Sequence, residues 1–237
     1  MATWVTHLII ADGVLERIPG LDRRGFCVGN IAPDCNQENE DWTAFMPPRE
    51  VTHWMGGSRK VAADCDRFYE EYIGKRRNEI ECAEEKSFLL GYYSHLITDA
   101  AFQAMIRDEE RVKAAWRRVK GNESLCRKSE GMAETWDSIK ILISRRERMM
   151  EIDALEAKYL RSHPDSGYLT EILPLKEFPD YIDYLPKGGI VRKIGVMGYL
   201  PQMDGAVPEM ISISEKEYHD FVSKTVELVV ERIRNGG

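Results

Sequence analysis

Histidine and cysteine are scarce in this chain of 237 residues, with five of each, and no long apolar run occurs. The odd number of cysteines and the lack of any Cys-x-x-Cys pair exclude a disulfide framework and a thiolate zinc knuckle. No stretch reaches the roughly 18 apolar residues that a membrane-spanning helix needs. Residues 1–12 also lack the basic flank and the long apolar core of a signal peptide, so we expect a cytoplasmic protein without a transmembrane segment.

The chain also has no excess of positively charged residues. The chain carries 33 Lys and Arg against 40 Asp and Glu, a net charge of −7. Such a chain has no general attraction to phosphate backbones, which argues against a nucleic acid as a dedicated partner. The hydrophobic content of 43% is that of a folded globule, and neither repeats nor low-complexity segments occur.

Helical spacing of apolar residues dominates what is present. The spacing predicts helices over 4–18, 58–75, 84–106, 107–120, 131–161 and 214–234. The segment 84–106 is apolar nearly all round, which is typical of a central buried helix. Residues 24–49, rich in Gly, Pro, Asn and Asp, are expected to form a long loop with short helical turns.

Six of the ten prolines fall between residues 164 and 208. We expect 164–213 to be an irregular excursion over the helical core, with a short strand at 188–194. The prediction is therefore an all-α, multi-helix single domain over 1–237. Its core would comprise 3–161 and 214–234, and it would bind metal.

Two polar residues on the apolar helix carry the first chemical signal. His95 and Asp99 are four residues apart, so they project from nearly the same helix face. A buried carboxylate is costly unless it is paired or binds a metal, and imidazole and carboxylate are both zinc ligands. A hydrogen-bonded His–Asp pair between two helices remains an alternative.

Three further residues occur near apolar surroundings in the first half of the chain. His7 lies on the inward face of the first helix, Asp34 follows Pro33, and His53 precedes Trp54. Each has a plain structural alternative, such as a core histidine or a turn residue. Three His and two Asp are nevertheless the ligand types of a zinc-rich site.

The order of these motifs resembles a known family. Thr6-His7-Leu8, residues 29–34 (Gly-Asn-Ile-Ala-Pro-Asp), Thr52-His53-Trp54 and His95-x-x-x-Asp99 together resemble the zinc-dependent phospholipase C family. That family shares its helical fold with the S1/P1 nucleases, and the resemblance covers about residues 4–105. It implies that Asp34, His53, His95 and Asp99 bind one zinc. Asp99 would bridge to a second zinc, ligated by His7.

The chain also departs from the family pattern. Trp4 lies inside the predicted first helix, so it would not supply the N-terminal ligand of the secreted phospholipases. No His follows Asp99 closely and no His-x-x-x-Glu pair occurs, so we expect one or two zinc ions, or another divalent metal, in place of three. Asp137 is a conceivable substitute ligand, although a solvated helix carboxylate is the simpler interpretation.

The resulting hypothesis is a metal-dependent phosphoester hydrolase that uses metal-activated water. The resemblance implies that Asp34 doubles as ligand and proton acceptor. The substrate would be a small phosphoester or a phospholipid headgroup, with phosphodiesters included. The alternative is a degenerate family member that binds metal without catalysis and acts as a binding or scaffold protein.

Overall fold

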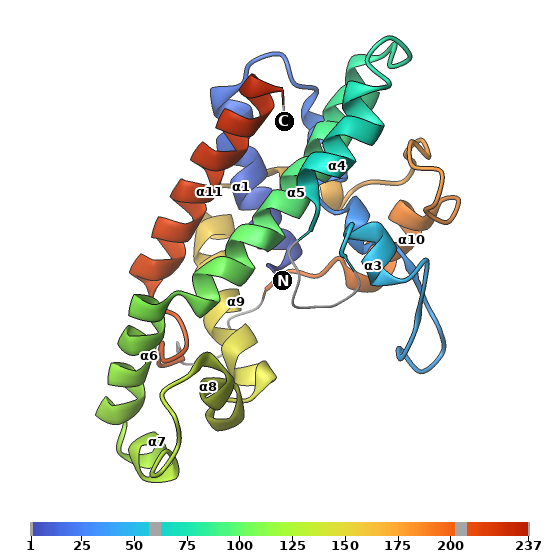
Figure 1. The fold of residues 1–237 in the computed structure, drawn as a ribbon. Helices are drawn as coiled ribbons and strands as arrows, with labels where there is room; N and C mark the ends of the chain where they lie inside the picture. Colours follow the sequence, from blue (N-terminus) through green and yellow to red (C-terminus); the bar gives the residue numbers. More distant parts are fainter. Residues whose placement is uncertain (1, 57–62, 202–207, 237) are drawn as a thin grey trace.

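The computed structural model describes residues 2–56, 63–201 and 208–236, and their regular secondary structure is almost entirely helical (Figure 1). The sole sheet in these ranges pairs β1 (Gln37–Glu38) with β2 (Phe45–Met46) in antiparallel orientation. The all-α prediction is confirmed. The helices are α1 (Trp4–Arg17), α2 (Arg23–Gly29), η1 (Ala32–Asp34), α3 (Arg49–Thr52), α4 (Cys65–Tyr69), η2 (Glu70–Gly74), α5 (Ala83–Arg107), α6 (Glu109–Gly121), α7 (Glu123–Lys128), α8 (Trp136–Leu142), α9 (Arg145–Ser162), η3 (Tyr168–Ile172), α10 (Gly189–Met197) and α11 (Glu215–Asn235).

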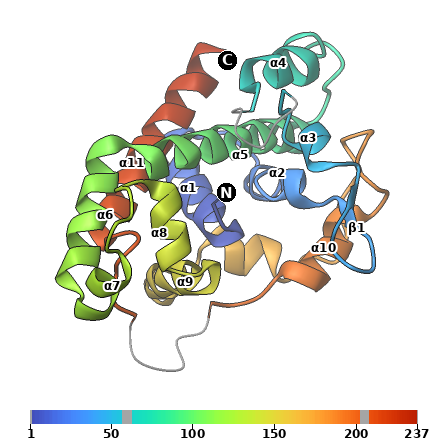
Figure 2. The ribbon, with the colours of Figure 1, turned by 60° about the horizontal axis from the view of Figure 1, so that its bottom comes forward.

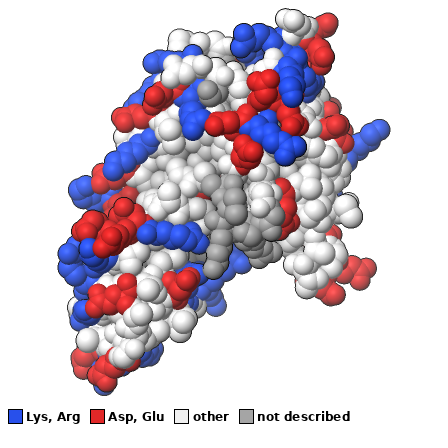
Figure 3. Space-filling model, viewed as in Figure 1, with Lys and Arg blue, Asp and Glu red and all other residues white. Residues whose placement is uncertain are grey.

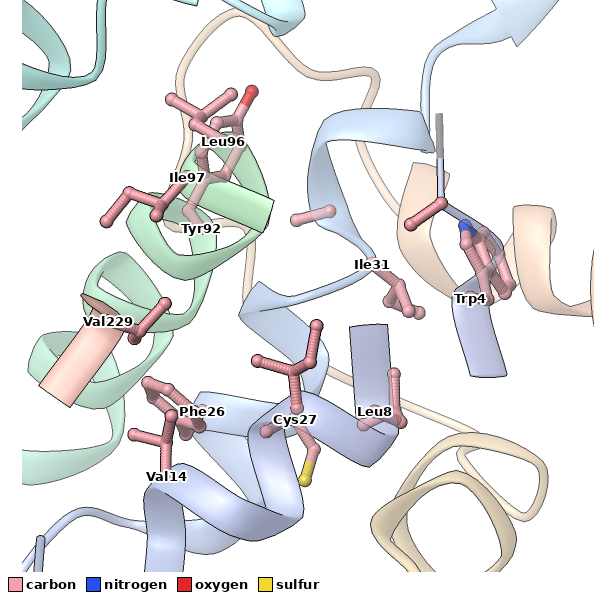
Figure 4. Packing of buried hydrophobic residues seen from close by; sticks show 14 of the residues in the cluster. Trp4, Leu8, Val14, Phe26, Cys27, Ile31, Tyr92, Leu96, Ile97 and Val229 are labelled. Atoms are coloured by element: carbon pink, nitrogen blue, oxygen red, sulfur yellow. The ribbon is translucent and has the colours of Figure 1, made fainter. Parts of the chain in front are cut away.

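Helix α5 is the central element, and every residue from Ser87 to Asp99 on it is buried. Helices α1, α2 and α11 pack around it, and the N-terminal end of α1 lies in the middle of the molecule (Figures 1 and 2). Figure 4 shows apolar side chains of these helices meeting in one cluster, including Leu8, Phe26, Leu96 and Val229. This cluster fixes the positions from which polar side chains of α1 and α5 project.

Two glycines allow α2 to cross α5 at backbone distance. A Cβ on Gly29 would collide with the carbonyl oxygen of Phe88, and a Cβ on Gly91 would collide with that of Phe26. Side chains cannot be accommodated where two backbones approach this closely. The crossing brings the end of α2 and the residues after it directly onto the helix that carries His95.

Four sequence-based predictions about individual elements were wrong. Residues 24–29 form most of α2 instead of loop, and the predicted helix 131–161 is interrupted at 143–144, between α8 and α9. Residues 189–194 of the expected strand are instead part of the helix α10, in which Ile190, Lys193 and Ile194 are buried. The helix expected from residue 58 begins at Cys65, with residues 58–62 outside the described ranges.

The segment 164–213 is tied to the core by buried carboxylates. Asp12 of α1 accepts hydrogen bonds from Ser166 Oγ (2.7 Å) and Gly167 N (3.0 Å). Glu151 of α9 accepts from the backbone amides of residues 211–213 at 2.9–3.1 Å. The excursion therefore lies against the core at both ends, and it contains η3 and α10. The single-domain boundaries stay a prediction.

On the face that Figure 3 shows, Lys and Arg are interspersed with Asp and Glu, and the described residues form no large patch of a single charge sign. None of the helices in the described part of the chain combines the length and the apolar character needed to cross a bilayer. The location of the protein stays a prediction.

Candidate metal centre

The fold brings all five predicted ligand residues together. His7 comes from α1, Asp34 from the end of η1, His53 from the residue after α3, and His95 and Asp99 from α5. Two groups of three have ligand atoms within 4.8 Å of one another and could hold a metal ion: His7 with His95 and Asp99, and Asp34 with His53 and His95. All are buried except Asp34, whose side chain is 12% exposed.

Hydrogen bonds outside the cluster orient His95 and His53. Nδ1 of His95 donates to the carbonyl oxygen of Asn30 at 2.7 Å, because a carbonyl can only accept. The Thr52 hydroxyl donates to the Arg49 carbonyl (3.3 Å), which leaves its lone pair to accept from His53 Nδ1 at 2.9 Å. In the neutral form, both rings therefore turn an Nε2 lone pair inward, and these two Nε2 atoms lie only 3.3 Å apart.

The backbone around His53 is held by a chain of hydroxyl groups. Tyr92 on α5 donates to the Thr52 carbonyl at 2.5 Å, and Tyr184 donates to Tyr92 at 2.9 Å. Trp54 adopts a left-handed conformation (φ 52°) and its indole donates to the Tyr184 hydroxyl at 3.0 Å. The turn that presents His53 is thus anchored on the same helix that supplies His95.

His7 is fully buried, and its ring stacks on that of His95 with centroids 3.8 Å apart. Neither ring nitrogen of His7 has a hydrogen-bond partner in the described part of the chain, and Nε2 lies 3.6 Å from Asp99 Oδ1. Buried polar atoms are rarely left unpaired, so these nitrogens need an explanation. A metal ion between His7 and Asp99 would supply one for Nε2.

The carboxylate of Asp99 faces both halves of the cluster. Oδ1 accepts from the backbone amide of Ala2 at 3.0 Å and faces His7. Oδ2 lies 3.8 Å from His53 Nε2 and accepts from Arg49 at 2.8 Å. With its two oxygens directed this way, Asp99 can bridge two ions. Nδ1 of His95 is already bonded to the Asn30 carbonyl, so only Nε2 of this ring is left to bind a metal ion. His95 belongs to both three-residue groups, and these two groups therefore compete for one ligand atom.

The charges in the cluster shift its pKa values strongly. Burial tends to raise the pKa of Asp34, but the neighbouring His53 and the positive charge of Arg49 hold it well below its usual range. Burial likewise opposes ionisation of Asp99, whereas His7 and His95 hold its pKa well below normal. Burial and the neighbouring His7 lower the pKa of His95 to about 3. Ionised carboxylates beside a neutral imidazole are the protonation states that metal ligands need.

Two residues of the site were missed by the sequence analysis. Arg49 donates to Asp34 Oδ1 at 3.4 Å as well as to Asp99, and Trp4 Nε1 donates to Asp34 Oδ2 at 3.1 Å. Arg49 precedes His53 by four residues, so helical spacing could have placed them together. No sequence signal pointed from Trp4 to Asp34, which are joined only by the tertiary fold.

Other candidates lie outside the cluster. Asp137 on α8 is exposed and pairs with Lys140, as expected for a solvated helix carboxylate. His163 and His219 are exposed at the surface. The five predicted residues fit a site for divalent metal, with imidazole and carboxylate ligands of the kind that zinc prefers. Their roles as ligands stay a prediction.

Comparison with known proteins agrees with this geometry. Residues 6–102 match the family model described as zinc dependent phospholipase C, and the matched stretch contains all five residues. No curated protein and no solved structure gives a significant match. This match over residues 6–102 supports membership of the zinc-dependent phospholipase C family.

Proposed function

We propose that the protein is a metal-dependent phosphoester hydrolase that binds one or two zinc ions through His7, Asp34, His53, His95 and Asp99. The observation that carries the proposal is the approach of His53 Nε2 and His95 Nε2 to 3.3 Å, with carboxylates of Asp34 and Asp99 beside them. Two inward lone pairs at this distance repel each other unless a proton or a cation lies between them. The substrate class we propose is a phosphodiester, either a phospholipid headgroup or a small phosphoester.

The residues of the chain have distinct tasks in this proposal. Zinc, when bound, supplies a water that is nucleophilic near neutral pH and positive charge for a phosphoryl group. Asn30 and Thr52 hold His95 and His53 in the orientation that directs Nε2 inward. Asp34 stays ionised because its pKa is depressed, which suits a ligand; its second task as proton acceptor is part of the proposal.

A second candidate is a family member that binds metal without turnover and serves as a binding or scaffold protein. The observation that favours it is Arg49, whose guanidinium pairs with both Asp34 and Asp99 and so stabilises the cluster by itself. The two candidates differ in turnover alone. A metal-loaded protein that hydrolyses no phosphomonoester, phosphodiester or phospholipid would favour the second.

Metal analysis of protein purified without a nickel column tests the proposal. We expect zinc, iron or manganese at one or two equivalents, and loss of both metal and hydrolysis in His95→Asn and Asp99→Asn. His163→Asn is the matched control, because His163 is an exposed histidine outside the cluster. Absence of bound metal in the wild type, or metal retained in full by both cluster variants, would contradict the proposal.

A further inference from the structure

Arg49 is a charged residue of this cluster that is not itself a proposed metal ligand. Its Nη2 lies 2.8 Å from Asp99 Oδ2 and its Nη1 lies 3.4 Å from Asp34 Oδ1. We propose that Arg49 is the phosphate-binding residue of the site, and that its guanidinium takes phosphoryl oxygens of the substrate beside the metal. This inference rests on the proposed function and names one of its specificity determinants.

The net charge of the metal-loaded cluster would favour binding of an anion. Asp34 and Asp99 contribute two negative charges, and Arg49 contributes one positive charge. A single divalent ion bound among these groups would give the cluster a net charge of +1, and a second ion would raise this to +3. A buried cluster with such an excess attracts an anion, and a phosphoryl group carries the charge that compensates it.

The position of Arg49 suits an incoming ligand. Its side chain is 19% exposed, whereas those of His7 and His53 are 0% and 3% exposed, so Arg49 lies at the solvent side of the cluster. The backbone at Arg49 is fixed, because its carbonyl oxygen accepts from His53 N at 2.8 Å and from the Thr52 hydroxyl. A guanidinium presents several N–H donors in one plane, which match two oxygens of a phosphate.

The proposal predicts opposite effects of one substitution. Arg49→Gln removes a positive charge from beside two metal ligands, so metal binding should become tighter. The same change removes charge-assisted hydrogen bonds to phosphate, so phosphate binding should become weaker. A purely structural role for Arg49 would instead weaken both, because a distorted cluster binds metal and anion less well.

The test uses the zinc-loaded chain, freed of excess zinc, and two titrations. Zinc affinity is measured by competition with a chelator, and the affinity for inorganic phosphate is measured by calorimetry. For Arg49→Gln we expect zinc affinity to rise several-fold and phosphate affinity to fall by about 10- to 100-fold, the range of a lost charged hydrogen bond. Arg49→Lys keeps the positive charge but lacks the planar guanidinium. Its phosphate affinity should lie between those of Arg49→Gln and the wild type. Arg77→Gln, at an exposed arginine in the turn before α5, should change neither the zinc affinity nor the phosphate affinity.

The outcomes separate this inference from the proposed function. Unchanged phosphate affinity in Arg49→Gln, or no phosphate binding by the zinc-loaded wild type, overturns the role of Arg49 even if the enzyme hydrolyses esters. Joint loss of zinc and phosphate binding in both Arg49 variants also overturns it, in favour of a structural role. Zinc and phosphate binding with the expected changes but no turnover of any ester supports the role of Arg49 and refutes the proposed hydrolase.

Discussion

Nε2 of His53 and Nε2 of His95 lie 3.3 Å apart, although the two residues are 42 positions apart in the chain. Each ring is turned by a hydrogen bond on its other nitrogen, to Thr52 in one case and to Asn30 in the other. The cluster is thus organised from outside by groups that would not touch a metal. Such partners fix ring orientation and tautomer, and they make the predictions below specific.

Zinc should stabilise the folded protein. A ligand that binds only the native state at 100 times its Kd adds about 2.7 kcal/mol to the free energy of unfolding. For a chain of this length we expect a rise of roughly 5–10 °C in Tm, measured by calorimetry with zinc and after chelation. Calcium, which prefers oxygen ligands, should have a smaller effect. Equal Tm values with zinc and with chelator would contradict a zinc site.

Thr52→Val should weaken metal binding without removing any ligand. The substitution deletes the hydroxyl that accepts from His53 Nδ1, so the ring loses the partner that fixes its orientation. Loss of such a partner typically costs about 10- to 100-fold in metal affinity. Thr225→Val is the matched control, because that buried hydroxyl donates to the Phe221 carbonyl within α11, away from the cluster. The same zinc affinity in both variants would show that Thr52 does not orient His53.

Gly91→Ala should destabilise the fold and disturb the site together. The added Cβ meets the backbone carbonyl of Phe26, which cannot rotate away, so α2 and α5 must separate. Overpacking of this kind costs about 1–3 kcal/mol, and the shift should also lengthen the contact between His95 and Asn30. Gly121→Ala, at the end of α6 where a Cβ meets nothing within 4 Å, should not destabilise the fold. Urea unfolding and zinc affinity measure the two effects, and a stable Gly91→Ala with normal zinc binding would refute the crossing.

Glu156 should make stability depend on pH. It is fully buried on α9, where one oxygen accepts from Thr3 and Thr6 and the other has no partner in the described part of the chain. Burial raises its pKa to about 7 from an ordinary value of 4.5. The folded state therefore holds this proton more tightly than the unfolded state does, and the stabilisation is complete below pH 4.5 and lost as pH rises through 7.

Glu156→Gln is the variant that isolates this group. It should remove that part of the pH dependence and unfold with a higher free energy than the wild type at pH 8, by at most about 3 kcal/mol. Urea unfolding between pH 4 and pH 8 compares the two proteins. Parallel stability curves for the wild type and Glu156→Gln would show that Glu156 does not titrate in this range.

The sequence was most informative where helical spacing and ligand chemistry coincided. His95 and Asp99 could be placed on one helix face from their spacing alone, and Ser214 with Glu217 gave the capping box that starts α11. The convergence of His7, Asp34 and His53 on that pair was not derivable from spacing, because it depends on how α1, α2 and α3 pack against α5. The resemblance to a family supplied that step.

The remaining errors have physical causes. Residues 24–29 contain two glycines and so have low helix propensity, but the α2–α5 crossing requires a small residue at Gly29 and tertiary packing outweighs propensity. The break after α8 was signalled by Ser144 and Glu147, a capping box that the sequence analysis did not use. In α10, Ile190 and Val191 favoured a strand locally, yet Lys193 is buried there as the ion-pair partner of Glu38.

The hydrogen bond from His95 Nδ1 to Asn30 also offers a spectroscopic probe. Its proton is buried and bonded at 2.7 Å to a carbonyl, so it should exchange slowly with water and be observable by proton NMR in the region downfield of the amides. That resonance would belong to a ring whose other nitrogen faces the proposed metal. A shift of this single line during a zinc titration would report on loading of the site from within the core.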